Sequence, residues 1–200
     1  MSAADAIEVC RRLLGLSLFV QAVEMLFVAR RLRAGEFPFE PWRARLPAAL
    51  RGVLGFLGGR GFVAVAALQA ALGLLLVACA AGFCLPLVAL TLGVMTARFA
   101  GHFNGGSDGM TRVVLGGLLL DAASCFGEPR LRVVGLGWIA VQLTASYFVA
   151  GWIKLREPGW RSGTAVAAIV NAGHYDVPPR TRAWLSRPVV SRVASWGTLA

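Results

Sequence analysis

Residues 62–97 read FVAVAALQAALGLLLVACAAGFCLPLVALTLGVMTA, and these thirty-six positions contain no Asp, Glu, Lys or Arg. The segment GFCLP at residues 82–86 divides the stretch into two apolar blocks, and its Gly and Pro indicate a turn. A helix rises about 1.5 Å per residue and a hydrocarbon core is about 30 Å thick, so about 20 apolar residues cross it. The stretch therefore predicts two membrane-spanning helices joined by a short turn.

The composition of the whole chain agrees with a membrane protein. Hydrophobic residues make up 57% of it and charged residues 15%, and the mean hydropathy is +0.67. The formal charge of +10 does not indicate nucleic-acid binding, because the basic residues gather between apolar segments rather than on one soluble domain. No segment alternates like a membrane barrel strand. We expect one all-α domain over residues 1–200, a polytopic transmembrane helix bundle in the bilayer.

Apolar segments predict five membrane spans, with the charged residues gathered in the segments between them. The expected spans are residues 13–29, 62–81, 85–103, 113–126 and 133–153. Of the twenty Lys and Arg residues, sixteen fall on one side of this arrangement and four on the other. The positive-inside rule then puts the N-terminus outside and the long basic segments in the cytoplasm of a plasma (inner) membrane protein.

The C-terminal segment, residues 154–200, is basic and contains a helix-breaking pair, Pro178 and Pro179. Residues 163–173 are too few to cross a bilayer and predict a half-buried or surface helix. Residues 195–200 resemble the first turn of another helix, so we expect a further span beyond them.

Several polar residues fall inside the predicted spans, where a carboxylate costs at least about 2.5 kcal/mol by insertion scales. Glu24, Asp121 and Gln142 are therefore expected to be buried polar residues that face the bundle interior. Gln21 shares a helical face with Glu24, and Gln69 lies in the second span. Two interpretations remain open, interhelical hydrogen bonds that fix the bundle, or a proton relay or ligand contact.

The loop before the fourth span is rich in glycine and short polar residues. The backbone N–H groups of this loop can turn toward an anion or a carbonyl. The candidate ligand-binding residues here are Asn104, Ser107, Asp108 and His102. The alternative is a capped turn at the membrane surface.

Residues 142–155, QLTASYFVAGWIKL, bring hydroxyl groups and a lysine into the last predicted span. Tyr147 is a further candidate ligand-binding residue. Lys154 is either a residue that extends to the headgroups or, if an apolar pocket lowers its pKa, a general base. The four cysteines lack metal-ligand spacing, so no metal site is expected.

Residues 147–155, YFVAGWIKL, with Trp160 and Gly163, resemble the signature of vitamin K-dependent gamma-carboxylase-like proteins, which share the horizontally transferred transmembrane (HTTM) domain. Residues 104–108, NGGSD, resemble the preceding loop of that family. The resemblance implies that Lys154 is the base that deprotonates a reduced quinone such as vitamin K hydroquinone. In the family, the oxygenated quinol then removes a proton from a substrate glutamate before carbon dioxide adds. The chain departs from the family in having Gly105 where a histidine follows the asparagine, and in lacking the large extramembrane domain.

Two functional hypotheses follow. In the first, the protein binds a lipophilic quinol-like molecule and Lys154 acts as base, in carboxylase-like or quinol-oxidising chemistry. In the second, it is a non-catalytic membrane subunit that holds a protein partner through its basic loops and through small-residue faces such as Gly116–Gly117. A transporter is less consistent with the sequence, because it shows no repeated pair of broken spans.

Overall fold

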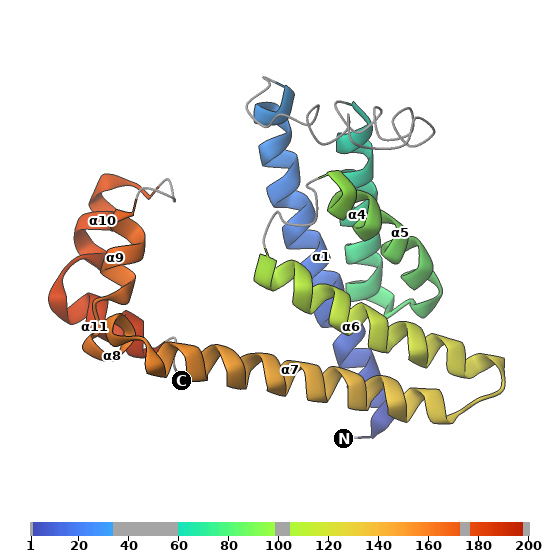
Figure 1. Cartoon of the computed structure of the whole chain (residues 1–200). Coiled ribbons are helices and arrows are strands. Elements are labelled where there is room, and N and C mark those ends of the chain that lie inside the picture. Colours follow the sequence, from blue (N-terminus) through green and yellow to red (C-terminus); the bar gives the residue numbers. More distant parts are fainter. Residues whose placement is uncertain (1, 34–59, 99–104, 173–176, 198–200) are drawn as a thin grey trace. The chain divides into compact units, whose positions relative to one another are not determined.

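The computed structural model describes residues 2–33, 60–98, 105–172 and 177–197, and every element in these ranges is a helix (Figure 1). The predicted all-α class is confirmed for these ranges. The chain divides into two compact units, Met1–Val141 and Gln142–Ala200.

The boundary between the two units falls inside a long helix, α7 (Arg130–Arg156). Before α7, the first unit contains α1 (Ala3–Arg33), α4 (Arg60–Cys79), the short 3-10 helix η2 (Gly82–Cys84), α5 (Leu85–Arg98), α6 (Gly105–Ala123) and the 3-10 helix η3 (Ser124–Phe126). After α7, the second unit contains α8 (Pro158–Ser162), α9 (Ala165–Asn171), α10 (Pro179–Leu185) and α11 (Pro188–Gly197).

Helix α1 begins with a reciprocal pair of hydrogen bonds between Ser2 and Asp5. The Ser2 backbone N–H donates to the Asp5 carboxylate at 2.7 Å, and the Asp5 N–H donates to Ser2 Oγ at 3.1 Å. This is a capping box, which satisfies two of the N–H groups that a helix start leaves unpaired. The Ser2 N–H and then the Ser2 hydroxyl lower the pKa of Asp5.

Three helices in the described ranges are long and apolar enough to cross a membrane, Arg60–Cys79, Asp108–Phe126 and Arg130–Arg156. They correspond to the second, fourth and fifth predicted spans. The predicted first span lies in α1 but does not qualify, and that helix carries Glu24 in its second half. The third corresponds to α5, which has only 14 residues, while residues 99–103 lie outside the described ranges. The predicted count of five spans is therefore not confirmed.

Helices α1 and α4 pack at very short range because glycines face each other. A Cβ built on Gly15 would lie 2.6 Å from the carbonyl oxygen of Gly73, and one built on Gly73 would lie 2.7 Å from that of Gly15. Any side chain at either position would push the two backbones apart. Figure 1 shows the two helices side by side.

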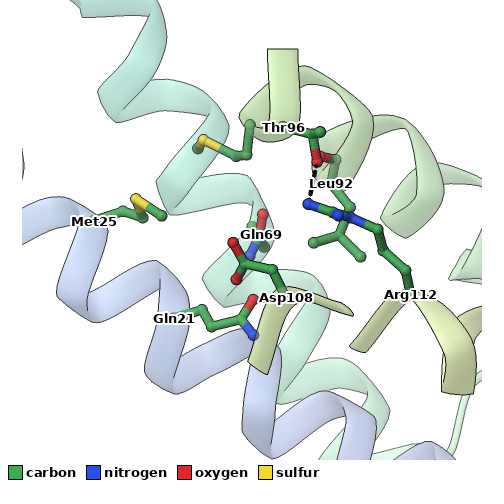
Figure 2. A pocket seen from close by; sticks show the side chains of 8 residues that line it. Gln21, Met25, Gln69, Leu92, Thr96, Asp108 and Arg112 are labelled. Carbon is green, nitrogen blue, oxygen red and sulfur yellow. Dashed lines mark hydrogen bonds between the residues drawn. The ribbon is translucent and has the colours of Figure 1, made fainter. Parts of the chain in front are cut away.

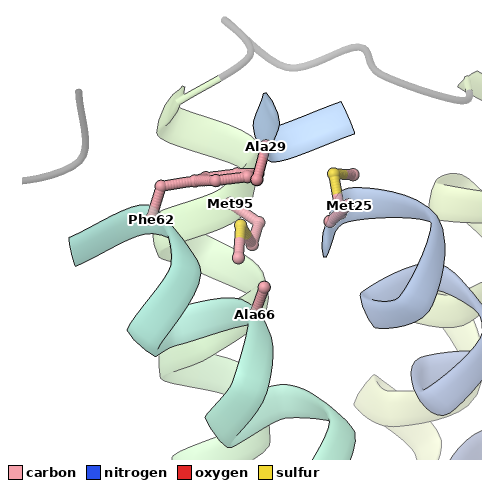
Figure 3. Close-up of a cluster of buried hydrophobic side chains, with 5 residues drawn as sticks. All are labelled: Met25, Ala29, Phe62, Ala66 and Met95. Atoms are coloured by element: carbon pink, nitrogen blue, oxygen red, sulfur yellow. The ribbon is translucent and has the colours of Figure 1, made fainter. Parts of the chain in front are cut away.

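Another part of the first unit's interior is filled by a small apolar cluster (Figure 3). Met25 and Ala29 from α1 meet Phe62 and Ala66 from α4, and Met95 joins them from α5. All five are at least 95% buried. Methionines suit this site because their flexible side chains fill irregular gaps between helices.

A second pair of glycines brings α6 against the first part of α7. A Cβ built on Gly135 would collide with the carbonyl oxygen of Gly117. The Trp138 indole N–H, about one turn further along α7, donates to the Val113 carbonyl oxygen at 3.2 Å. The small-residue face at Gly117, which the sequence offered for a protein partner, is therefore occupied within the chain by α7.

Most of the apolar surface of α7 has no cover within the described chain. Only 11% of its most apolar 18-residue stretch is buried. Large apolar side chains are exposed along its length, Val133, Val134, Val141, Phe148, Val149, Trp152 and Ile153 among them. An exposed apolar surface of this kind is compatible with contact to a lipid bilayer.

We expect Gly73→Ala to lower the free energy of unfolding by about 1–3 kcal/mol, because the added methyl group has no room between α1 and α4. Gly93→Ala in α5 is the matched control, since a Cβ there meets nothing within 4 Å. The control should be neutral or stabilising by up to about 1 kcal/mol, the gain in helix propensity. Thermal unfolding of both variants in detergent measures the difference, and equal melting temperatures would contradict the close packing.

Candidate functional site

The most buried charged group in the described part of the first unit is Asp121, near the end of α6. Its side chain is 1% exposed, and both of its oxygens bind arginines. Arg11 Nη2 of α1 lies 2.6 Å from Oδ2, and Arg132 Nε of α7 lies 2.8 Å from Oδ1. Asp121 therefore ties three helices together, as the hydrogen-bonding interpretation of the polar residues expects. Neither arginine was singled out by the sequence. Arg11 lies 110 positions from Asp121, and Arg132, although only 11 positions away, lies on the next long helix beyond a turn.

Arg11 also binds the backbone at the end of α4. Its Nη1 donates to the carbonyl oxygen of Ala80 at 3.4 Å. Ala80 has a φ of 48°, which is unusual for a residue with a Cβ. The guanidinium also packs against Gly82, where a Cβ would lie 3.0 Å from it. Arg11 thus fixes the turn between α4 and α5. The turn spans residues 80–84, whereas the sequence predicted residues 82–86, of which Leu85 and Pro86 instead begin α5.

A polar cavity lies between α1, α4, α5 and α6 (Figure 2). The cavity volume is about 20 Å³, and one side of it is open. Polar and apolar side chains share its wall, Gln21, Met25, Gln69, Leu92, Met95, Thr96, Asp108 and Arg112. Among the predicted site residues, Asp108 is the one that lines it. In Figure 2 its carboxylate points toward the side chains of Gln21 and Gln69.

Two sets of hydrogen bonds hold the polar wall in place. On one side Gln21 Nε2 donates to Thr111 Oγ1 at 2.9 Å, and Ser17 Oγ lies 3.2 Å from the same hydroxyl. On the other side Arg112 Nη2 donates to Thr96 Oγ1 at 2.9 Å. The sequence did not single out Arg112, although it follows Asp108 by four residues and so shares its helix face.

Gln69 presents an unsatisfied acceptor to this cavity. Its side chain is 2% exposed, and its Oε1 has no hydrogen-bond partner in the described chain. A buried polar atom without a partner costs about 1–3 kcal/mol. Such a cost at a cavity wall indicates a place for a hydrogen-bond donor, which a water or a ligand hydroxyl can supply.

Apart from Glu24, the remaining predicted site residues belong to the second unit, or they or their side chains lie outside the described residues. Lys154 is half-buried, with its ammonium 4.9 Å from the ring centre of Trp160. Tyr147 is exposed on α7 and Gln142 is half-buried. Asn104 and His102 lie outside the described residues, as does the side chain of Ser107.

Glu24, which the sequence places in the bundle interior, is instead exposed in the described chain. The buried face of α1 is centred on Leu18, Met25 and Ala29. At about 100° per residue, Glu24 falls about 120° from the centre of that face, whereas Gln21 stays at its edge. Sharing a face with Gln21 was therefore not enough to bury Glu24.

Within the described ranges, no group of three His, Cys, Asp or Glu residues is placed to hold a metal ion. All four cysteines are free thiols. Comparisons of the chain with family models, with curated proteins and with solved structures find no match.

We expect Asp121→Asn to lower the free energy of unfolding by about 1–3 kcal/mol, because it leaves the partly buried Arg11 guanidinium without its counter-charge. The matched control is Glu8→Gln in α1, which breaks an exposed ion pair with Arg12 of the same 2.6 Å length. The control should cost less than about 0.5 kcal/mol. Thermal unfolding in detergent compares them, and equal losses would show that burial of the Asp121 pair is unimportant.

Proposed function

We propose that the chain is an integral membrane protein that binds the hydroxyl end of a lipophilic quinol in the cavity between α1, α4, α5 and α6. The membrane part of this proposal is supported by the three long apolar helices and by the uncovered apolar surface of α7. The ligand part depends on one observation, the buried Gln69 Oε1, to which no group in the described residues donates a hydrogen bond.

The cavity chemistry favours a ligand that donates a hydrogen bond. Gln69 Oε1 accepts but cannot donate, and the carboxylate of Asp108 also lines the cavity. The methionines and Leu92 supply an apolar wall for a ring or chain. The cavity volume of about 20 Å³ has room for about one hydroxyl, so we place one hydroxyl of the quinol inside and the rest toward the opening.

A separate part of the proposal takes Lys154 as the base, and it rests on the resemblance of residues 147–155 to the carboxylase-like family and not on the cavity. In the family that this stretch resembles, the base takes the proton of a quinol hydroxyl, and the quinolate then reacts with dioxygen.

The reduced quinol should bind more tightly than the oxidised quinone, because only the quinol has a hydroxyl to donate to Gln69. Gln69→Leu should weaken quinol binding roughly tenfold and remove most of this difference. Vitamin K hydroquinone and the corresponding quinone are titrated against the protein in nanodiscs, with binding followed by tryptophan fluorescence. Equal affinity for both forms in the unchanged protein would overturn the assignment.

Gln21→Leu is the control for a structural effect. Gln21 lines the same cavity but donates to Thr111, so its loss should lower the melting temperature. Gln69→Leu should keep the melting temperature within a few degrees, since the acceptor it removes has no partner in the described chain. A large loss of stability in Gln69→Leu would assign that side chain to packing rather than to a ligand.

Lys154→Ala should abolish quinol-dependent oxygen consumption or epoxide formation in proteoliposomes, because the base that accepts the hydroxyl proton is removed. Arg156→Ala is the control, as it removes a neighbouring cation that lies 4.6 Å from the Trp152 ring centre. Turnover that persists in Lys154→Ala would remove the catalytic part of the proposal and leave the binding part.

The second hypothesis is a non-catalytic subunit that binds a protein partner. The partner would have to bind a surface other than the one at Gly117. That glycine is in contact with α7, and most of the basic loop lies outside the described residues. Co-purification of a stoichiometric partner that is lost when the arginines of residues 30–60 are changed would favour it.

A further inference from the structure

The last helix of the second unit, α11, has its polar side buried. Ser191 and Ser195 are 2% and 0% exposed. Ser191 Oγ donates to the Gly163 carbonyl oxygen at 2.7 Å and accepts from the Ala167 N–H at 3.3 Å. Ser195 Oγ accepts from the Val166 N–H at 3.3 Å. The two serines of α11 therefore cap the first turn of α9, whose own N-cap, Thr164, makes no such bond.

The opposite side of α11 is apolar and exposed. Val189, Val193 and Trp196 are 74%, 68% and 48% exposed. Their spacing places them within about 60° of one another around the helix, roughly opposite the two serines. A helix on a protein in water normally shows the reverse arrangement, with its apolar side buried.

Close backbone packing fixes this orientation of α11. Gly163 has a φ of +78°, and a Cβ built on it would lie 2.8 Å from the Cα of Arg192. Rotating α11 to bury its valines would break this contact and both serine caps. The exposed apolar stripe is thus a consequence of specific packing.

The positive charge around the exposed apolar side of α11 indicates which surface it would contact. Residues 177–197 contain four arginines and no acidic residue. Two tryptophans, Trp184 and Trp196, are about half-exposed in the same segment. Apolar side chains, exposed tryptophans and arginines together are the pattern of a segment that lies in the interface of an anionic bilayer.

We propose that α10 and α11 form an interfacial docking surface that inserts Val189, Val193 and Trp196 into an anionic leaflet while the arginines bind lipid phosphates. This inference concerns a different part of the chain from the quinol cavity. A second copy of the chain is a poorer occupant, because two such surfaces would bring like charges together.

The test uses the full chain in liposomes, with its four native cysteines replaced by alanine and an NBD fluorophore on Val193→Cys. In vesicles with roughly one third phosphatidylglycerol, the emission should shift to the blue and a nitroxide-bearing lipid should quench most of it. Quenching should be much weaker in phosphatidylcholine vesicles and in the Arg180→Gln/Arg187→Gln variant. It should also fall between about 0.1 M and about 1 M salt.

A label on Ala194→Cys is the matched control, because this half-buried residue lies about 100° around α11 from Val193. It should be quenched less, and Val189→Cys should behave like Val193→Cys. Flotation of the unlabelled chain in high salt is measured separately, so that failure of membrane integration is distinguished from failure of docking.

Three results would overturn the proposal. The first is a water-like, unquenched signal at Val193 in anionic vesicles. The second is a blue-shifted signal that the nitroxide lipid does not quench, which would indicate contact with protein. The third is equal quenching in neutral and anionic vesicles, which would remove the role of the arginines.

Discussion

Polar groups between apolar helices must find their partners inside the protein, because lipid offers no hydrogen bonds. This constraint explains where the first unit places its ions. Asp121 is buried only because Arg11 and Arg132 take one carboxylate oxygen each. Arg11 also reaches the carbonyl oxygen of Ala80, so one guanidinium joins α1 and α6 to the end of α4.

In the described part of the first unit, the side-chain oxygen of Gln69 does not meet this requirement. Gln21 has Thr111 as a partner, whereas the acceptor of Gln69 in the same cavity wall has none in the described chain. Close helix packing leaves little freedom to correct this, since the Gly15–Gly73 contact holds α1 and α4 at a fixed separation. A site that is rigid, polar and incompletely satisfied suits a ligand that supplies the missing donor.

The second unit also contains polar groups that find partners inside the protein, among them serine hydroxyls and backbone groups. Its serines face inward to satisfy backbone N–H groups, and its valines and Trp196 face outward. With α7, whose apolar surface is almost wholly uncovered, this gives the chain an exterior suited to lipid. The interior of each unit is correspondingly held by hydrogen bonds and glycine contacts as well as by apolar packing.

The sequence by itself determined the helical class, the apolar segments and, to within two residues, the turn that it placed at residues 82–86, because length, hydropathy and helix breakers are local properties. It also marked Gln69, Asp108 and Asp121 as polar residues that require an explanation. Only the tertiary structure decided which of them have partners, since Asp121 and Arg11 are 110 positions apart. In the tertiary structure Glu24 is exposed and Gly117 is covered by α7. The angle at which one helix packs on another decides which side of each helix is buried. That angle depends on contacts between distant segments, which no local pattern in the chain records.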